Sequence, residues 1–143
     1  ETRLTYDDER RKANLFATLG PVEGAGVVLS GHTDVVPVDG QAWDTDPFEL
    51  TEAGDRLLGR GSADMKSFIA VALHLAPEFI ARKLKVPLHF ALSYDEEVGC
   101  IGVGRLLSDL ERAGIRPASC IVGEPTQMRP VIAHKGRWDT AAR

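Results

Sequence analysis

Several features that would assign this sequence of 143 residues to a class at once are missing. No apolar run approaches the roughly 18 residues of a membrane span, and the first residues do not form a signal peptide. Acidic and basic residues are mixed along the chain, with a net charge of −4, so the basic patch that nucleic-acid binding needs is absent. We therefore expect neither a membrane nor a nucleic acid as a partner.

Cysteine is also scarce. The two cysteines, Cys100 and Cys120, form no CxxC motif and are too few for a disulfide framework. Such cysteines are typical of reduced thiols. We therefore expect a cytoplasmic protein.

Several well-known catalytic and nucleotide-binding motifs are absent as well. There is no GxSxG elbow, no phosphate-binding P-loop and no readable Ser-His-Asp arrangement. Three glycines near a helix start, Gly99, Gly102 and Gly104, do not have the spacing of a dinucleotide fingerprint. The sequence contains no repeats and no low-complexity segments.

What remains is the composition of an ordinary globular domain, with 43% hydrophobic and 27% charged residues. The length is sufficient for one domain with a core of its own. The chain starts at Glu1 without an initiator Met and stops at Arg143, just after a strand-like run. We expect it to be part of a longer protein.

The apolar pattern predicts strands that alternate with helices. Predicted strands cover 14–19, 26–30, 57–58, 86–94, 119–122 and 131–134, and predicted helices cover 65–83 and 102–113. Pro77 predicts a kink or an early end in the first helix. This alternation indicates an α/β fold, with a layered, mixed and mainly parallel sheet flanked by helices.

Acidic residues and one histidine follow the ends of these predicted strands. His32, the pair Glu96–Glu97 and Glu124 each lie at such an end, and Asp64 lies at the start of the first helix. Ligands bind to parallel α/β sheets beyond the carboxyl ends of the strands. The pattern therefore predicts one site that collects these side chains.

His32 and Asp34 are two residues apart, so on an extended segment their side chains point the same way. Asp34 could then accept the proton of the far imidazole nitrogen and fix the ligating tautomer. The alternative is a turn histidine beside a solvated Asp. Asp64 could be a metal ligand or a helix N-cap; Gly59 and Gly61 favour the ligand because they allow the backbone an unusual path into a site.

Glu96 and Glu97 follow Asp95, and three adjacent carboxylates could simply form a solvated turn. In the functional interpretation, one glutamate binds metal and the other takes a proton from water. Glu124 is either a ligand or an exposed loop carboxylate. Nitrogen and oxygen ligands together suit zinc, and also cobalt or manganese.

The other histidines have no partner pattern. His74 falls within a predicted helix and His89 within a predicted strand, so we interpret both as structural or surface residues. His134 ends the last predicted strand.

The sequence resembles the M20 family of zinc-dependent amidohydrolases and peptidases from about residue 14 to residue 136. The matching segments are GHTDVVP (31–37), WDTDPFEL (43–50), GRGSADMK (59–66), DEE (95–97), GEPT (123–126) and HKG (134–136). The first five of these six segments, in this order, make the resemblance specific for the family and less specific for the substrate.

The resemblance implies a role for each matching residue. His32 and Glu124 would bind a first metal, Asp64 would bridge two metals, Glu97 would bind the second, Asp34 would orient His32, and Glu96 would be the general base and acid. One or two zinc ions are implied, with cobalt or manganese possible.

The resemblance also implies hydrolysis of the amide bond of a small N-acyl amino acid. N-acetylornithine, hydrolysed to ornithine and acetate in arginine biosynthesis, is the favoured substrate. The alternatives are N-succinyl-diaminopimelate, other N-acyl amino acids or dipeptides, and, in another class, a non-catalytic member of the fold that binds a ligand.

In the family, a further ligating histidine lies beyond an inserted lid or dimerisation domain. The resemblance therefore implies that residues 1–136 are the N-terminal part of an incomplete, zinc-peptidase-like catalytic domain and that 137–143 begin the lid domain. We expect the full-length protein to be a homodimer. The 143 residues alone should bind at most one metal well and have little activity.

Overall fold

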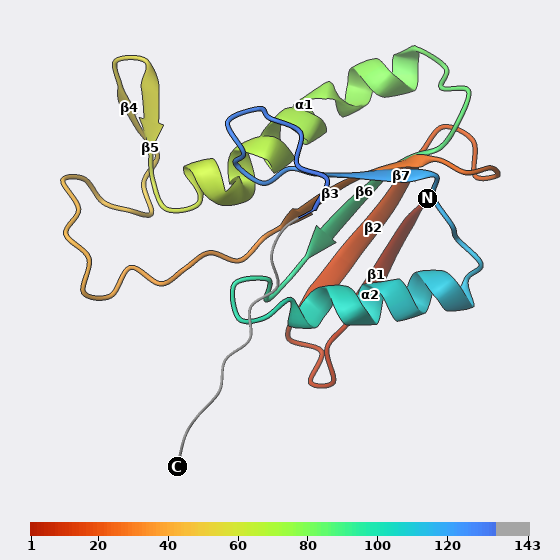
Figure 1. The fold of residues 1–143 in the computed structure, drawn as a ribbon, viewed down its shortest axis with the longest axis horizontal. Helices are drawn as coiled ribbons and strands as arrows, with labels where there is room; N and C mark the ends of the chain where they lie inside the picture. Colours follow the sequence, from red (N-terminus) through yellow and green to blue (C-terminus); the bar gives the residue numbers. More distant parts are fainter. Residues whose placement is uncertain (134–143) are drawn as a thin grey trace.

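A computed structural model describes residues 1–133 and consists of a sheet between two helices, with a small hairpin at one side (Figure 1). The strands of the main sheet are β1 (Thr2–Tyr6), β2 (Ala13–Leu19), β3 (Val27–His32), β6 (Leu88–Ser93) and β7 (Ser119–Val122). The hairpin comprises β4 (Thr51–Ala53) and β5 (Arg56–Leu58). The helical segments are η1 (Ser62–Lys66), α1 (Ser67–Ala81) and α2 (Ile101–Arg112).

The main sheet has the strand order β1-β2-β6-β3-β7. Strand β3 pairs in parallel with both β6 and β7, whereas β1 and β2 are joined to the sheet by antiparallel pairings. The predicted layered α/β domain with a mixed sheet and flanking helices is confirmed. Its parallel part is confined to β6, β3 and β7, and all the candidate site residues except Asp64 lie at or just after the ends of these strands.

The two helices cover opposite faces of the sheet (Figure 1). The hydrophobic core lies between α2 and the sheet and is formed by Phe16, Val28, Ala91, Leu106 and Leu110. Full burial of each large apolar side chain contributes about 1.5–3 kcal/mol. This core holds the parallel strands in register and thereby fixes where they end.

The predicted elements are confirmed within a few residues, apart from β4, which lies where no strand was predicted, and three further differences. The first is β1, which the sequence analysis did not predict. Thr and Tyr favour strands, and β1 pairs with β2 along its whole length, with Leu4 opposite Leu15. Its partner strand supplies the hydrogen bonds that so short a segment needs.

The second difference concerns the first helix. Regular helix begins at Ser67, after the irregular turn η1, in which Asp64 and Met65 have non-helical backbone angles. The predicted early end at Pro77 is wrong, because α1 continues to Ala81. Pro77 and Leu73 are exposed, so water can bond the Leu73 carbonyl that loses its helical partner.

The third difference lies after β7. The strand predicted at 131–134 is wrong for residues 131–133, which are exposed and form no strand. A strand needs a neighbour to satisfy its backbone groups. His134 lies outside the described residues, as do residues 137–143, for which a lid domain was predicted.

Within residues 1–133, no helix combines the length and the apolar character that crossing a membrane requires.

Candidate metal centre

Three parallel strands bring the candidate residues to one edge of the sheet. Strand β3 ends at His32, which is in register with Ser93 at the end of β6, and Ser30 is in register with Val122 at the end of β7. The turn after β6 holds Glu96 and Glu97, and Glu124 follows β7. Because neighbouring parallel strands end at the same edge, the side chains that follow them meet there.

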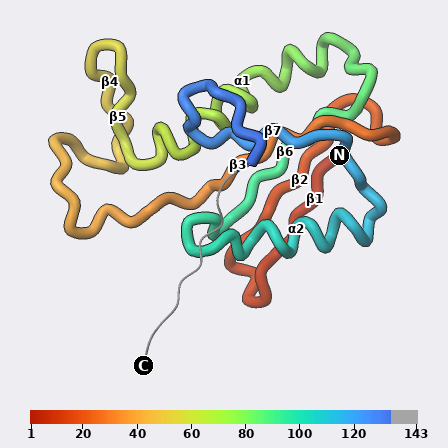
Figure 2. The backbone as a smooth tube through the Cα atoms, in the orientation of Figure 1, coloured from red at the N-terminus to blue at the C-terminus, as the bar shows by residue number. Residues whose placement is uncertain are grey.

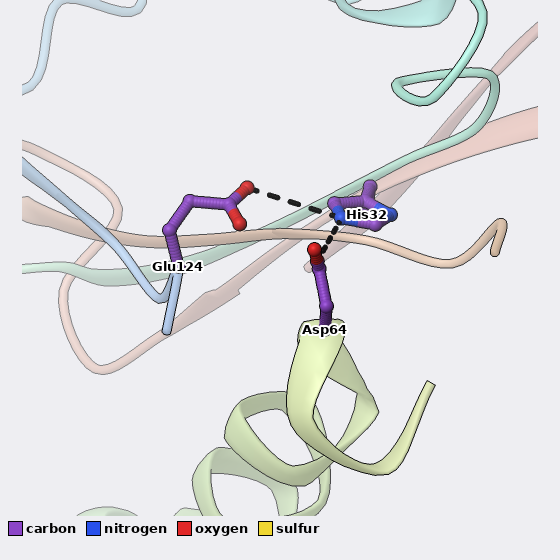
Figure 3. Close-up of side chains that lie close together, drawn as sticks. All are labelled: His32, Asp64 and Glu124. Carbon is purple, nitrogen blue, oxygen red and sulfur yellow. Dashed lines mark hydrogen bonds and ion pairs between the residues drawn. The ribbon is translucent and has the colours of Figure 1, made fainter. Parts of the chain in front are cut away.

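Asp64 reaches this edge from the layer above the sheet. It lies in η1, and Figure 3 shows its carboxylate directed from this helical turn at His32. Gly61 has a φ of 82°, and a Cβ on it would lie only 2.6 Å from Val35 Cγ1. The predicted unusual backbone path is therefore present at Gly61, whereas no positive φ is recorded at Gly59.

Glu124 is brought in by a close approach between β7 and α1. A Cβ on the preceding residue, Gly123, would lie 2.0 Å from the ring of Phe68 in α1. Figure 2 shows the segment after β7, in blue, beside the start of α1. Only glycine permits this approach without displacement of the ring.

The imidazole of His32 lies at the centre of the cluster, and the residue is only 2% exposed. Its Nδ1 is 2.9 Å from the main-chain carbonyl oxygen of Asp34 and 3.5 Å from the Asp34 carboxylate. Since a carbonyl oxygen can only accept, Nδ1 carries the proton. In the neutral ring, Nε2 is then the nitrogen with a free lone pair, which is what a metal ligand requires.

Carboxylates surround this Nε2. It lies 2.9 Å from Asp64 Oδ1, 3.8 Å from Glu124 Oε1 and 3.9 Å from Glu96 Oε2. Figure 3 shows Asp64 and Glu124 directed at the imidazole from two different elements. Among residues 1–133, two sets have ligand atoms within 4.8 Å of one another: His32, Asp64 and Glu124, and His32, Glu96 and Glu97.

The structure thus brings together all six residues singled out in the sequence, with Asp34 behind the imidazole. One grouping differs from the expected one, because Glu97 shares a set with His32 and Glu96 rather than with Asp64. Asp64 nevertheless acts on Glu97, since its negative charge is among the causes that raise the pKa of that carboxyl.

The electrostatics of the cluster indicate an excess of negative charge. Burial, followed by the charge of Asp64, raises the pKa of both Glu97 and Glu124. Burial opposes a charged His32, yet the hydrogen bond to Asp64 and the neighbouring carboxylates raise the pKa of the imidazole above its ordinary value. A divalent cation among these oxygens would compensate the same charge.

Asp34 contributes in a way that its position in the sequence did not reveal. Its carboxylate accepts hydrogen bonds from the main-chain N–H groups of Glu96 (3.1 Å) and Glu97 (3.0 Å). Burial alone would raise the pKa of Asp34, but these two amides, together with a main-chain bond of Asp34 itself and the charge of His32, lower that pKa. Asp34 is therefore a charged acceptor that joins the segment after β3 to the turn after β6.

The sequence profile of peptidase family M20/M25/M40 matches residues 28–135, which include every residue of the cluster. The chain belongs to this family.

Among curated proteins, this M20 chain is similar to enzymes named acetylornithine deacetylase. It is 42% identical to that of Aliivibrio salmonicida over 135 residues, which is 94% of this chain and 35% of the relative. It is also 42% identical to that of Shigella sonnei over 134 residues, which is 94% of this chain and 34% of the relative. The chain thus spans about a third of the length of these relatives.

Solved structures show the same fold. An M20 family metallo-carboxypeptidase from Sulfolobus solfataricus superposes with a TM-score of 0.73 at 21% identity, over 86% of this chain and 28% of that chain. Human carnosine dipeptidase 1 superposes with a TM-score of 0.67 at 26% identity, over 85% of this chain and 29% of that chain.

One side chain beside the M20 cluster was not singled out for the site by the sequence analysis. The Sγ of Cys100 lies 3.4 Å from Glu96 Oε1. The two residues are four apart in one turn, and this spacing is the signal that could have linked them. The remaining histidines agree with their interpretation, since His74 is exposed and His89 is buried within the sheet.

Proposed function

We propose that the protein is a metal-dependent hydrolase of N-acyl amino acids, with N-acetylornithine as its substrate and ornithine and acetate as its products. The convergence of His32, Asp64 and Glu124 in a member of the M20 family carries this proposal. The identity of 42% to proteins named acetylornithine deacetylase supports the choice of substrate.

The donor set fits a divalent metal ion. One buried imidazole directs its Nε2 at the surrounding carboxylates, and these carry more negative charge than the ring can balance. Zinc prefers such nitrogen and oxygen ligands, and cobalt or manganese would also be accepted. His32, Asp64 and Glu124 would hold a first ion, and Asp64 with Glu97 would contribute to a second. When bound, the metal would supply a Lewis acid that polarises the amide carbonyl and lowers the pKa of water.

Glu96 would move the proton in this reaction. Its side chain is 37% exposed and its Oε2 lies 3.9 Å from His32 Nε2, so it can reach both solvent and substrate. Glu96 takes a proton from the attacking water while the water oxygen bonds to the amide carbon. The carbon–nitrogen bond then breaks, and Glu96 returns the proton to the leaving amine.

A dipeptide is the second candidate substrate. The likeness at 26% identity to human carnosine dipeptidase 1 favours it. Dipeptides and N-acyl amino acids share an amide bond next to a free carboxylate, and the cluster can act on either. The cytoplasmic location, the homodimer and the domain boundary at residue 136 stay predictions.

The decisive measurement is hydrolysis of N-acetylornithine, N-succinyl-diaminopimelate and a dipeptide by the full-length gene product, with added zinc and with a chelator. Zinc-dependent release of ornithine would support the proposal. Hydrolysis of only the dipeptide would change the substrate class. A folded, metal-loaded protein that hydrolyses none of them would contradict the enzyme and favour a non-catalytic binding role.

The role of Glu96 is tested in the same assay. Glu96→Ala should keep its zinc content and lose turnover by about 10²–10⁴-fold, the usual contribution of a general acid–base group. Glu52→Ala, at an exposed position of the hairpin strand β4, is the matched control and should retain turnover. Normal turnover in Glu96→Ala would remove this residue from the mechanism.

A further inference from the structure

The turn that carries Glu96 and Glu97 has its main-chain N–H groups bonded in an ordered way. The N–H groups of Gly99 and Cys100 donate to the carbonyl of Glu96, at 3.0 and 2.9 Å. The N–H of Ile101 donates to the carbonyl of Asp95 at 3.0 Å. These three bonds are local, and they determine the shape of the turn without attaching it to the rest of the site.

The bonds from Glu96 and Glu97 to Asp34 are different, because they span 62 and 63 residues of sequence. Each oxygen of the carboxylate accepts one N–H: Oδ1 accepts from Glu96 and Oδ2 from Glu97. Two further long-range contacts of the turn are ion pairs: His32 Nε2 lies 3.9 Å from Glu96 Oε2, and Lys12 pairs with Asp95, with the lysine side chain 51% exposed. An exposed pair is screened by water and holds a turn only weakly.

Asp34 therefore contacts both halves of the cluster. Its carbonyl oxygen accepts from Nδ1 of His32, and its carboxylate holds the turn that carries Glu96 and Glu97. We infer that the Asp34 carboxylate is the positioning residue of the Glu96–Glu97 turn and sets the placement of the proton-transfer group relative to the metal ligands. This inference rests on the proposed function for the roles of these groups, but the contact itself does not depend on that function.

Asp34→Asn is the informative substitution because it keeps the size of the side chain. The Asn side chain has one acceptor oxygen, so it can accept from one of the two N–H groups. Its NH₂ group is a donor and faces the second N–H, so at least one hydrogen bond is lost. The main-chain carbonyl that bonds His32 is retained. Asp39→Asn is the matched control, since Asp39 lies five residues away in the same segment, is exposed and has no side-chain hydrogen bond or ion pair within residues 1–133.

The primary readout is amide hydrogen exchange of Glu96 and Glu97 in the full-length gene product with a chelator present. Both amides should be protected in the unsubstituted protein and should exchange about tenfold faster or more in Asp34→Asn, because hydrogen bonds to charged groups are the stronger ones. Asp39→Asn should leave them unchanged. Equal exchange in Asp34→Asn and the unsubstituted protein would overturn the inference.

Two further measurements keep the test decisive. If Asp34→Asn does not fold, unprotected Glu96 and Glu97 amides in the unsubstituted protein would overturn the inference and protected ones would support it. If the gene product is active, kcat per folded molecule should fall at least tenfold in Asp34→Asn while KM changes less than about twofold, and unchanged kcat would count against the positioning role. An inactive gene product with faster exchange in Asp34→Asn would contradict the proposed function and leave this inference standing.

Discussion

Two histidines are buried within residues 1–133, and their surroundings differ. His32 is 2% exposed and His89 is 4% exposed, and they lie on neighbouring parallel strands. The Nε2 of His32 faces carboxylates, whereas His89 stacks on the ring of Phe16, with centroids 4.9 Å apart, and its Nδ1 lies 2.9 Å from the hydroxyl of Thr18.

Their pKa values move in opposite directions as a result. Burial lowers the pKa of His89. Burial also disfavours a charged His32, but Asp64 and the neighbouring Asp34 and Glu124 raise the pKa of that imidazole. Position along the strand makes the difference: His32 ends β3 at the edge where loops deliver acidic groups, and His89 lies inside β6. Burial alone therefore does not identify a functional histidine.

The largest expected contrast is in metal affinity. Loss of groups that merely support a ligand costs 10–100-fold in affinity, so His32→Ala, which removes a ligand, should weaken zinc binding by about 100-fold or more. His89→Ala should leave zinc affinity within about twofold and instead lower the free energy of unfolding by about 2 kcal/mol, as a cavity in the core does. Zinc titration against a competing chelator, together with urea unfolding, measures both. Equal losses of affinity in the two variants would show that the contrast between the histidines is wrong.

A second, smaller contrast uses the glycines near each histidine. A Cβ on Gly123 would meet the Phe68 ring, and a Cβ on Gly26 would lie 2.3 Å from the Pro87 carbonyl oxygen and 2.8 Å from Nε2 of His89. Each change to Ala should lower the free energy of unfolding by about 1–3 kcal/mol, the usual cost of overpacking. Only Gly123→Ala should also weaken zinc binding, by about tenfold, because it displaces the neighbouring ligand Glu124.

The control for this pair is internal, since both variants add the same methyl group. Denaturant unfolding and zinc titration of the two proteins side by side give the comparison. Weaker zinc binding in Gly26→Ala would mean that strain at the far end of the sheet reaches the site. It would contradict the prediction that only Gly123→Ala affects zinc binding.

The sequence predicted the histidine at the edge better than the histidine in the strand, and the reason is physical. His32 and Glu124 each follow a glycine at the end of an apolar run, so local pattern alone places them at strand ends. His89 owes its environment to Phe16, which is 73 positions away and reaches it only through the antiparallel pairing of β2 with β6. No local pattern carries that information.

The same limit applies within the site. The spacing of His32 and Asp34 predicted a bond from the imidazole to the Asp34 carboxylate. In the structure the nearest acceptor is the Asp34 main-chain carbonyl, and the carboxylate accepts from the main-chain N–H groups of Glu96 and Glu97. Likewise, Pro77 predicted a kink or an early end of α1, but the helix continues to Ala81 because the exposed Leu73 carbonyl can bond water instead. Composition and spacing predict which residues form the site. Which of their atoms form hydrogen bonds depends on the tertiary structure.

The smallest expected effect concerns pH and is specific to His89. In the unfolded chain His89 has its ordinary pKa of 6.5, and in the folded protein burial lowers it. The unfolded state therefore binds more protons below pH 6.5, and the free energy of unfolding should decrease as the pH falls from 6.5 toward the lower pKa of the folded state. His89→Gln, which can still bond Thr18 but cannot be protonated, should lack this decrease. The free energy of unfolding of both proteins at pH 7.5 and pH 5.5, with a chelator present, tests it.

The raised pKa of His32 acts in the opposite sense but is common to both proteins, so it cancels in their difference. If the two proteins differed in free energy of unfolding by the same amount at both pH values, His89 would have the same pKa in the folded and unfolded states. That result would contradict the lowered pKa of His89.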